Sequence, residues 1–359
     1  MVDGVSDGKA RASAGPGAGH GISASQGSPS AAAGGPAAGG PAAGGPAEPG
    51  AAAVHVITGK GGTGKSTIAG ALALRLAAGG GRVLLVEVEG RPSISATLGL
   101  REFPGAPAKV ATAAGGGEVH ACSLDAEVVL EDYLSSNVGS SLAIAAARKF
   151  GVTEFATTIA PGLRDVLLSG FIVAEARRGG WSAVVVDAPP TGRVARFLDV
   201  TRALGEIATS GPIHRQAADT AAFLRSGSTR VHMVTLAEPL PVRESMEALD
   251  ELRAVGLPLG SVVANRLLDD ALCDAALSLS HDDVAAIAGD GPVAAALASE
   301  LDDVAARARV QRRSFGDLAA GWPGPVARVP ALPGGVRIEG LYDVAELVSA
   351  LDHREVRDE

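Results

Sequence analysis

Glycine and lysine are concentrated in one nine-residue segment that directly follows a short apolar run. The run is Val54–Thr58, and the segment reads GKGGTGKST from Gly59 to Thr67. Glycines let consecutive backbone N–H groups turn inward around an anion, and a helix that begins near Ser66 adds the positive end of its dipole. The spacing GxxxxGK[ST] therefore predicts a strand, a phosphate-binding loop and a helix, in that order.

The loop also predicts how a nucleotide is held. We expect Lys65 to contact the β- and γ-phosphates of ATP and the Ser66 hydroxyl to ligate Mg²⁺. Only five lysines occur beside 26 arginines, and two of the five lie in this loop, which argues against chance. A glycine-rich turn without a ligand is the less favoured alternative. The predicted nucleotide-binding residues of the loop are Gly59, Gly61, Gly62, Thr63, Gly64, Lys65, Ser66 and Thr67.

Short β-branched runs alternate with helical stretches along the rest of the chain. Each run is almost continuously apolar, as is typical of strands buried on both faces, and the helical stretches supply the crossovers that parallel strands need. We therefore predict an α/β fold: a doubly wound, mostly parallel sheet of about seven to eight strands with helices on both faces. After the first run, the others are Arg82–Glu89, Glu118–Leu124, Ser182–Ala188, Arg230–Leu236, Ser261–Leu267 and Val326–Leu332.

Composition divides the chain once. Residues 1–53 consist mainly of Gly, Ala, Pro and Ser, with the repeat GGPAAGGPAAGGPA from Gly34 to Ala47, and have almost no large apolar side chains. Such a segment cannot bury enough surface to offset its backbone entropy, so we predict a disordered tail. We expect residues 54–359 to form the folded P-loop domain, in which 125–180 and 199–228 make a reduced helical subdomain.

Charge and cysteine content argue against several classes of function. The net charge is −9, which disfavours nucleic acid as the main partner. The two cysteines, Cys122 and Cys273, are isolated, so neither a disulfide scaffold nor a zinc cluster within one chain is expected. No apolar run approaches about 18 residues and the amino terminus lacks a hydrophobic signal core, so we expect a cytoplasmic protein without direct membrane insertion.

A second lysine separates this loop from the ordinary P-loop. The form KGGTGKS, with Lys60 directly after the first glycine, resembles the deviant P-loop of the family that includes septum-site and partition ATPases, nitrogenase iron protein, and the arsenite-pump and tail-anchored-protein-targeting ATPases. The resemblance implies a dimer in which Lys60 crosses the interface to the nucleotide of the facing subunit and acts in catalysis.

A further segment resembles the second switch of the arsenite-pump and tail-anchored-targeting branch. It reads VVVDAPPTGRVARFL, from Val184 to Leu198, with Asp187 at the end of the strand and Pro190 in the turn. An Asp at the carboxyl end of a buried strand beside a P-loop is placed to hold Mg²⁺ through water. Arg193 stands where that branch usually has His.

The first switch departs from the family pattern. LLVEVEGRPSISATLG, from Leu84 to Gly99, aligns with the family's strand and Asp-Pro turn, and Glu89 occupies the position of the water-activating Asp. Glu89 would orient or deprotonate the attacking water, although its extra methylene could slow hydrolysis. The alternative is that Glu87 and Glu89 are solvated carboxylates at the strand end, and this alternative is favoured for Glu87.

Two later segments resemble the family's nucleotide-base site. The strand Ser261–Leu267 contains Asn265, an amide that can both donate to and accept from the adenine edge. The segment ARVPALPGG resembles the loop that wraps the base, which places Pro330 and Leu332 near the adenine. A simple Pro-containing turn is the alternative for the latter two residues.

The resemblance implies a dimeric, Mg-ATP-dependent molecular-switch ATPase, slow in hydrolysis, that changes shape toward a client protein. The chain lacks the thiol cluster that binds metalloid and the CxxC pair that shares zinc in its relatives. Its partner is expected to be a second copy or a related P-loop ATPase. The alternative function is a nucleotide-binding regulatory or scaffold subunit with negligible hydrolysis, paired with a related catalytic ATPase. A DNA-partition ATPase is disfavoured by the acidic charge.

Overall fold

The computed structural model describes residues 45–88, 93–125, 128–129, 162–200, 212–332 and 336–352. All of them belong to one compact unit that spans Gly39–Glu359. Glu89 and most of the predicted helical segment 125–180 lie outside the described residues, as does part of 199–228. The reduced helical subdomain therefore stays a prediction.

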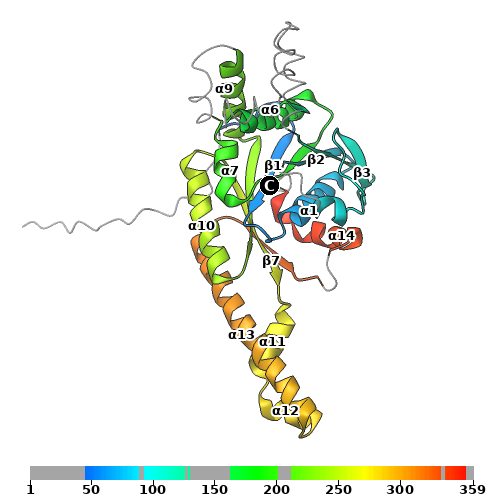
Figure 1. Cartoon of the computed structure of the whole chain (residues 1–359), viewed down its shortest axis with the longest axis vertical. Coiled ribbons are helices and arrows are strands. Elements are labelled where there is room, and N and C mark those ends of the chain that lie inside the picture. Colours follow the sequence, from blue (N-terminus) through cyan, green and yellow to red (C-terminus); the bar gives the residue numbers. More distant parts are fainter. Residues whose placement is uncertain are drawn as a thin grey trace, which may run out of the picture. The chain divides into compact units, whose positions relative to one another are not determined.

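The described residues form an eight-stranded sheet in the order β3-β4-β2-β5-β1-β6-β7-β8 (Figure 1). Neighbouring strands are parallel except for β3 and β4, which are antiparallel. This confirms the predicted doubly wound α/β fold. The strands are β1 Ala53–Gly59, β2 Arg82–Glu87, β3 Ala108–Thr112, β4 Glu118–Ser123, β5 Ala183–Asp187, β6 Thr229–Leu236, β7 Leu259–Leu267 and β8 Val326–Pro330.

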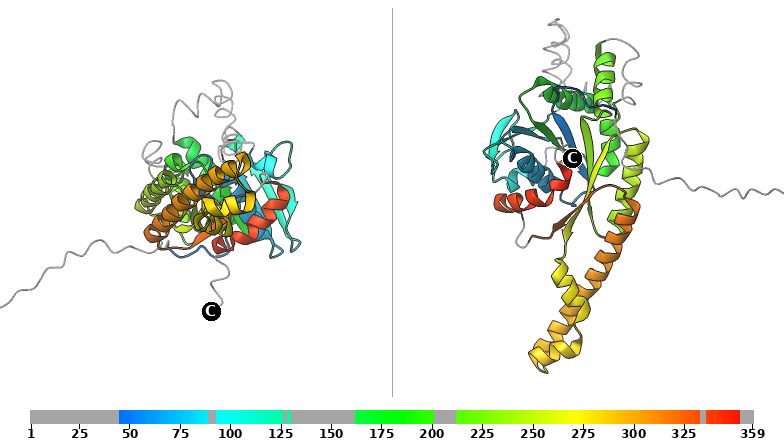
Figure 2. Two further views of the ribbon diagram at one scale, coloured as in Figure 1. Left: turned by 90° about the horizontal axis from the view of Figure 1, so that it is seen from below. Right: turned by 180° about the vertical axis from the view of Figure 1, so that it is seen from behind.

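Helices cover both faces of the sheet. On one face α1 packs against α14, and on the other face lie α6, α7, α9 and α10 (Figure 2). Successive side chains of one strand enter different cores: Leu84 and Val86 of β2 lie in one, and Val83 and Leu85 in the other. The helices are α1 Lys65–Ala77, α2 Ser93–Thr97, α6 Leu163–Arg178, α7 Thr191–Leu198, α9 Pro212–Leu224, α10 Pro239–Ala254 and α14 Ile338–Leu347, followed by the 3₁₀ helix Ser349–Leu351.

A helical extension is inserted between β7 and β8. It consists of α11 Asp270–Ser278, α12 His281–Ala288 and the 30-residue α13 Pro292–Gly321, and Figure 1 shows α12 at its far end. A capping box at Ser280 and Asp283 starts α12, although α12 buries no side chain. Arg312 of α13 is exposed and forms an ion pair with Asp274 of α11. No helix in the described ranges is long and apolar enough to cross a membrane.

The folded domain begins earlier than composition predicted. Gly45 forms a β-bridge with Ser226, and the Glu48 backbone N–H donates to the Ser228 hydroxyl at 2.7 Å. The Glu48 carboxylate accepts two hydrogen bonds from Arg177 of α6, at 2.8 and 2.7 Å. The tail boundary at residue 53 was therefore wrong for residues 45–53. Backbone hydrogen bonds and an ion pair hold this segment, and neither requires large apolar side chains.

Candidate nucleotide site

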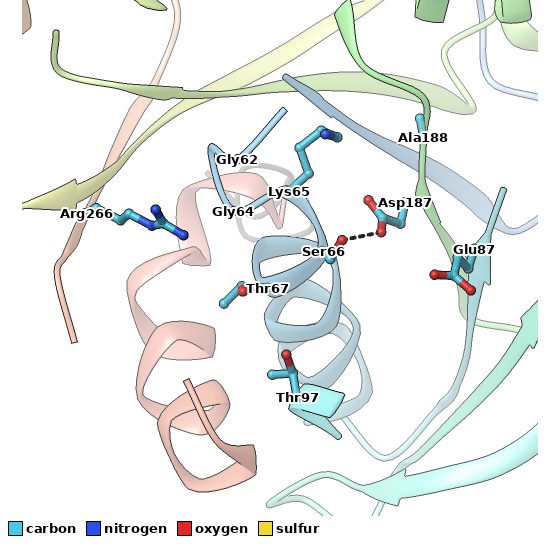
Figure 3. A pocket seen from close by; sticks show the side chains of 10 residues that line it. All are labelled: Gly62, Gly64, Lys65, Ser66, Thr67, Glu87, Thr97, Asp187, Ala188 and Arg266. Atoms are coloured by element: carbon cyan, nitrogen blue, oxygen red, sulfur yellow. Dashed lines mark hydrogen bonds between the residues drawn. The ribbon is translucent and has the colours of Figure 1, made fainter. Parts of the chain in front are cut away.

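A cavity of about 250 Å³ lies at the carboxyl ends of the central strands. It sits beside the end of β1, where β5 and β6 flank the first strand on either side, a position where doubly wound sheets bind their ligands. Figure 3 shows the loop before α1 at its centre, with side chains from β5, β2 and β7 around it. The lining residues are Gly62, Gly64, Lys65, Ser66, Thr67, Glu87, Thr97, Asp187, Ala188 and Arg266.

The glycines of the loop meet a backbone requirement and a space requirement. Gly64 caps α1 with φ 93°, a left-handed conformation that favours glycine. A Cβ on Gly64 would lie 2.3 Å from the amide nitrogen of Asn265, and one on Gly59 would lie 2.1 Å from the Val234 carbonyl oxygen. Thr63 closes the turn by donating from its hydroxyl to the Lys60 carbonyl at 2.9 Å. The loop is thus packed tightly against β6 and β7.

The two loop lysines have different surroundings. The Lys65 side chain is buried, and its ammonium donates to the Lys60 carbonyl at 3.4 Å. The Lys60 side chain is 49% exposed, and its ammonium pairs with the Glu244 carboxylate of α10. Lys65 therefore lines the cavity, whereas Lys60 does not line it and lies on the protein surface.

An acid and a hydroxyl meet at the entrance to α1. The Ser66 hydroxyl donates to Asp187 Oδ2 at 2.6 Å, and Asp187 is the last residue of β5 (Figure 3). Glu87, the last residue of β2, is the strand neighbour of Asp187 and is only 2% exposed. Glu87 is consequently a buried carboxylate of the site rather than the solvated side chain that the sequence favoured.

These oxygens fit a magnesium ion. Mg²⁺ commonly takes one or two protein oxygens and completes its shell with water and substrate phosphate. Ser66 and Asp187 are hard oxygen donors within one hydrogen bond of each other at the predicted phosphate loop. No cluster of three or more His, Cys, Asp or Glu side chains that would make an all-protein metal site occurs in the described ranges.

The segment that resembles the second switch is bonded to β1 at its start. The Thr58 hydroxyl donates to the Pro189 carbonyl at 2.8 Å, and α7 begins at Thr191 directly after the turn. Burial raises the pKa of Asp165 in α6, and the positive charge of Arg193 in α7 opposes that rise. Arg193, the departure from the family's His, therefore lies close enough to Asp165 to favour its ionised form.

The residues predicted to contact the nucleotide base lie in different places in the structure. The Asn265 amide N–H donates to the Thr63 carbonyl at 2.8 Å, so this side chain supports the P-loop. An amide has a second N–H and a carbonyl oxygen, so a base contact is compatible with that bond. Pro330 ends β8, and Leu332 packs against the core that contains α14. The residues that line the cavity do not include either of them.

Sequence reasoning missed one residue of the cavity wall entirely. Arg266 follows Asn265 and reaches the cavity from β7. The signal was its position directly after the predicted base-site amide. Thr97 and Ala188 also line the wall from segments already assigned to the two switches.

Comparison with known proteins agrees with this geometry. Residues 53–217 match the model of the family described as anion-transporting ATPase. This part of the chain is similar to the ATPases of that family. The match includes the phosphate loop and the two segments that resemble the family's switches, whereas β7, the helical extension and β8 lie outside it.

Individual relatives are similar to part of the chain. ATPase BagA of Mycobacterium tuberculosis is 52% identical over 219 residues, which cover 59% of this chain and 64% of BagA. A Prosthecochloris vibrioformis protein, provisionally named an arsenical pump-driving ATPase, is 25% identical over 250 residues, 59% of this chain and 60% of that protein. The chain thus spans less than two thirds of the length of these relatives.

Proposed function

We propose that the chain binds Mg-ATP in this cavity and hydrolyses it slowly. The observation that carries the proposal is the 2.6 Å hydrogen bond between Ser66 and Asp187, beside the buried Lys65. It brings together the hydroxyl, the carboxylate and the ammonium that a P-loop enzyme needs for phosphate and metal. The relatives named ATPase make hydrolysis the expected chemistry of such a site.

Each of these groups would do one part of the work. Lys65 would neutralise charge on the β- and γ-phosphates, and backbone N–H groups of the glycine loop would hold the same oxygens. Ser66 and Asp187 would hold Mg²⁺, which supplies charge neutralisation to the phosphate oxygens when bound. Glu89 is proposed to orient the attacking water. Glu87 would add a second carboxylate beside that of Asp187 at this edge of the sheet.

We further propose that the working unit is a dimer with a second copy or a related P-loop ATPase. The exposed Lys60 supports this proposal, because a lysine outside its own cavity is available to a neighbouring subunit. The two switch segments would then change how the subunits face each other and a client protein. We also propose that the protein is located in the cytoplasm.

The second candidate is a regulatory or scaffold subunit with negligible hydrolysis. It is favoured by one specific observation: Arg193 of α7 stands where the family has His, and its positive charge acts on Asp165 of α6. A related partner with a conventional switch would then perform the hydrolysis.

Binding and turnover measured separately distinguish the two candidates. Calorimetry with ATP, with Mg²⁺ and with EDTA, tests the site, and phosphate release under saturating Mg-ATP tests hydrolysis. Lys65→Ala should weaken ATP binding by roughly 100-fold or more, because the loop loses its buried ammonium. Unchanged affinity in this variant would refute the site. Measurable binding with no turnover in the native chain would select the regulatory function.

A further inference from the structure

One residue of the cavity wall has an unusual backbone. Arg266 has φ 56°, and among the non-glycine residues that the structure describes it alone has a positive φ. An L-residue with a long side chain rarely adopts this left-handed conformation, because its Cβ approaches the backbone. Observed strain of this kind concentrates at ligand sites, where the surrounding fold maintains it.

The strand pairing explains how the conformation is maintained. Ala264 pairs with Arg328 and Leu267 pairs with Pro330, so three steps along β7 match two steps along β8. One extra residue is therefore inserted in β7 at positions 265–266. A bulge of this kind redirects a side chain and occurs often beside active sites.

The bulge gives its two residues different tasks. Asn265 is buried and holds the Thr63 carbonyl of the P-loop. Arg266 is exposed and lines the cavity with Gly64 and Thr67. In Figure 3 its guanidinium is directed toward the loop, on the opposite side from Asp187 and Glu87. No hydrogen bond or ion pair to the guanidinium is found within the described part of the chain.

We propose that Arg266 binds the nucleobase of ATP by stacking its guanidinium plane on the purine ring. The inference rests on the proposed function and names the base contact of that same site. Lys65, Ser66 and Asp187 occupy the phosphate and metal end, so Arg266 on the opposite side meets the other end of the nucleotide. A guanidinium is planar and stacks well on aromatic faces, unlike a lysine ammonium.

The test compares ATP with inorganic tripolyphosphate, which has the phosphates but no base. Arg266→Gly should weaken ATP binding about tenfold, the scale of one stacking contact, and leave tripolyphosphate binding unchanged. Because glycine accepts φ 56°, the same variant should melt no lower than the native chain. Arg266→Asn, which also tolerates this conformation, repeats the measurement if the glycine variant folds poorly.

Arg266→Lys is the matched control, because it keeps the charge and loses the plane. Its ATP affinity should fall nearly as far as that of the glycine variant. Full rescue by lysine, an equal loss for tripolyphosphate, or unchanged ATP binding in Arg266→Gly would each overturn the base contact. Failure of the native chain to bind ATP would instead refute the proposed function itself, and the two failures are therefore distinguishable.

Discussion

At the scale of single residues, the site depends on charges that the fold brings together from distant strands. Ser66 lies in the first turn of α1, after the phosphate loop, while Asp187 and Glu87 end two neighbouring strands. Because parallel strands end at one edge of the sheet, chain segments more than 100 residues apart contribute oxygens to one small volume. Substitutions that keep side-chain size can test each charge without disturbing the packing.

Asp187→Asn should retain the fold and lose the magnesium dependence of ATP binding. The amide keeps the shape but removes the negative charge, so ATP affinity in Mg²⁺ should fall by about tenfold or more and approach the value in EDTA. Calorimetry in the two buffers measures this difference. Glu87→Gln serves as the size-matched control, and an equal loss in both variants would show that overall negative charge matters rather than the Ser66–Asp187 pair.

Cys122 should be unreactive in the folded protein. Burial raises the pKa of its thiol to about 12, because the thiolate is disfavoured in the core. Burial likewise raises the pKa of Cys273. A colorimetric thiol reagent at pH 8 should therefore label well under one thiol per native chain, and both thiols after denaturation. Rapid labelling of the native chain would contradict the buried placement of both side chains.

At the scale of elements, the P-loop is linked to α10 through the Lys60–Glu244 ion pair. Both partners are partly exposed, so the pair contributes under about 1 kcal/mol to stability. The pair keeps the Lys60 ammonium on the protein surface, and Lys60 does not line the cavity of its own chain. A P-loop lysine on the protein surface can contact a neighbouring chain.

Lys60→Ala should leave ATP affinity of the isolated chain within about twofold and abolish ATP-dependent association, because the lysine acts across the interface. Glu244→Gln is the matched control, since it breaks the same ion pair but retains the lysine. Sedimentation with a non-hydrolysable ATP analogue measures association. Loss of nucleotide binding by monomeric Lys60→Ala would contradict the crossing role.

The segment Gly45–Gly50 should stabilise the fold although the residues before it do not. Deleting residues 1–44 should leave the melting temperature almost unchanged, whereas deleting 1–50 should cost about 2 kcal/mol and a few degrees, because the bonds to Arg177 and Ser228 are lost. Thermal melts of the two truncations measure the difference. Equal melting temperatures would show that the segment contributes nothing.

The same pair of truncations should respond to pH in a defined direction. The hydrogen bonds from Arg177 lower the pKa of Glu48. A carboxyl group whose pKa is lowered by folding stabilises the fold above its unfolded pKa, and this stabilisation disappears as the pH falls through the folded value. The difference between the truncations should therefore be largest near neutrality and shrink in acid. A difference that grows below pH 4 would contradict the ion pair.

Sequence patterns predicted local features well and contacts between distant segments less well. The P-loop is contiguous, and Asp187 follows an apolar strand, so both were found directly. The edge strand β3 was missed because its side chains are half exposed and show no apolar run. The burial of Glu87 depends on neighbouring strands, and the bulge at Arg266 depends on pairing with β8, some 60 residues later.

At the scale of the whole molecule, the proposed dimer has a direct test. In the first experiment, the native mass of the purified chain with a saturating Mg-ATP analogue should be twice the chain mass. In the second, purification from the native cytosol should instead yield this chain together with an unlike P-loop chain. The first result supports a homodimer and the second a heterodimer. A chain that stays monomeric in both preparations would refute the dimer.

The helical extension starts four residues after Arg266, so its first residues lie close in sequence to the wall of the nucleotide cavity. Its longest helix, α13, has 30 residues and is therefore about 45 Å long. At that length a tilt of about 5° about one end displaces the other by about 4 Å. A tilt of the extension too small to alter the packing beside the bound base would therefore move the far end of α13 much further. Another protein bound at that far end could detect this displacement.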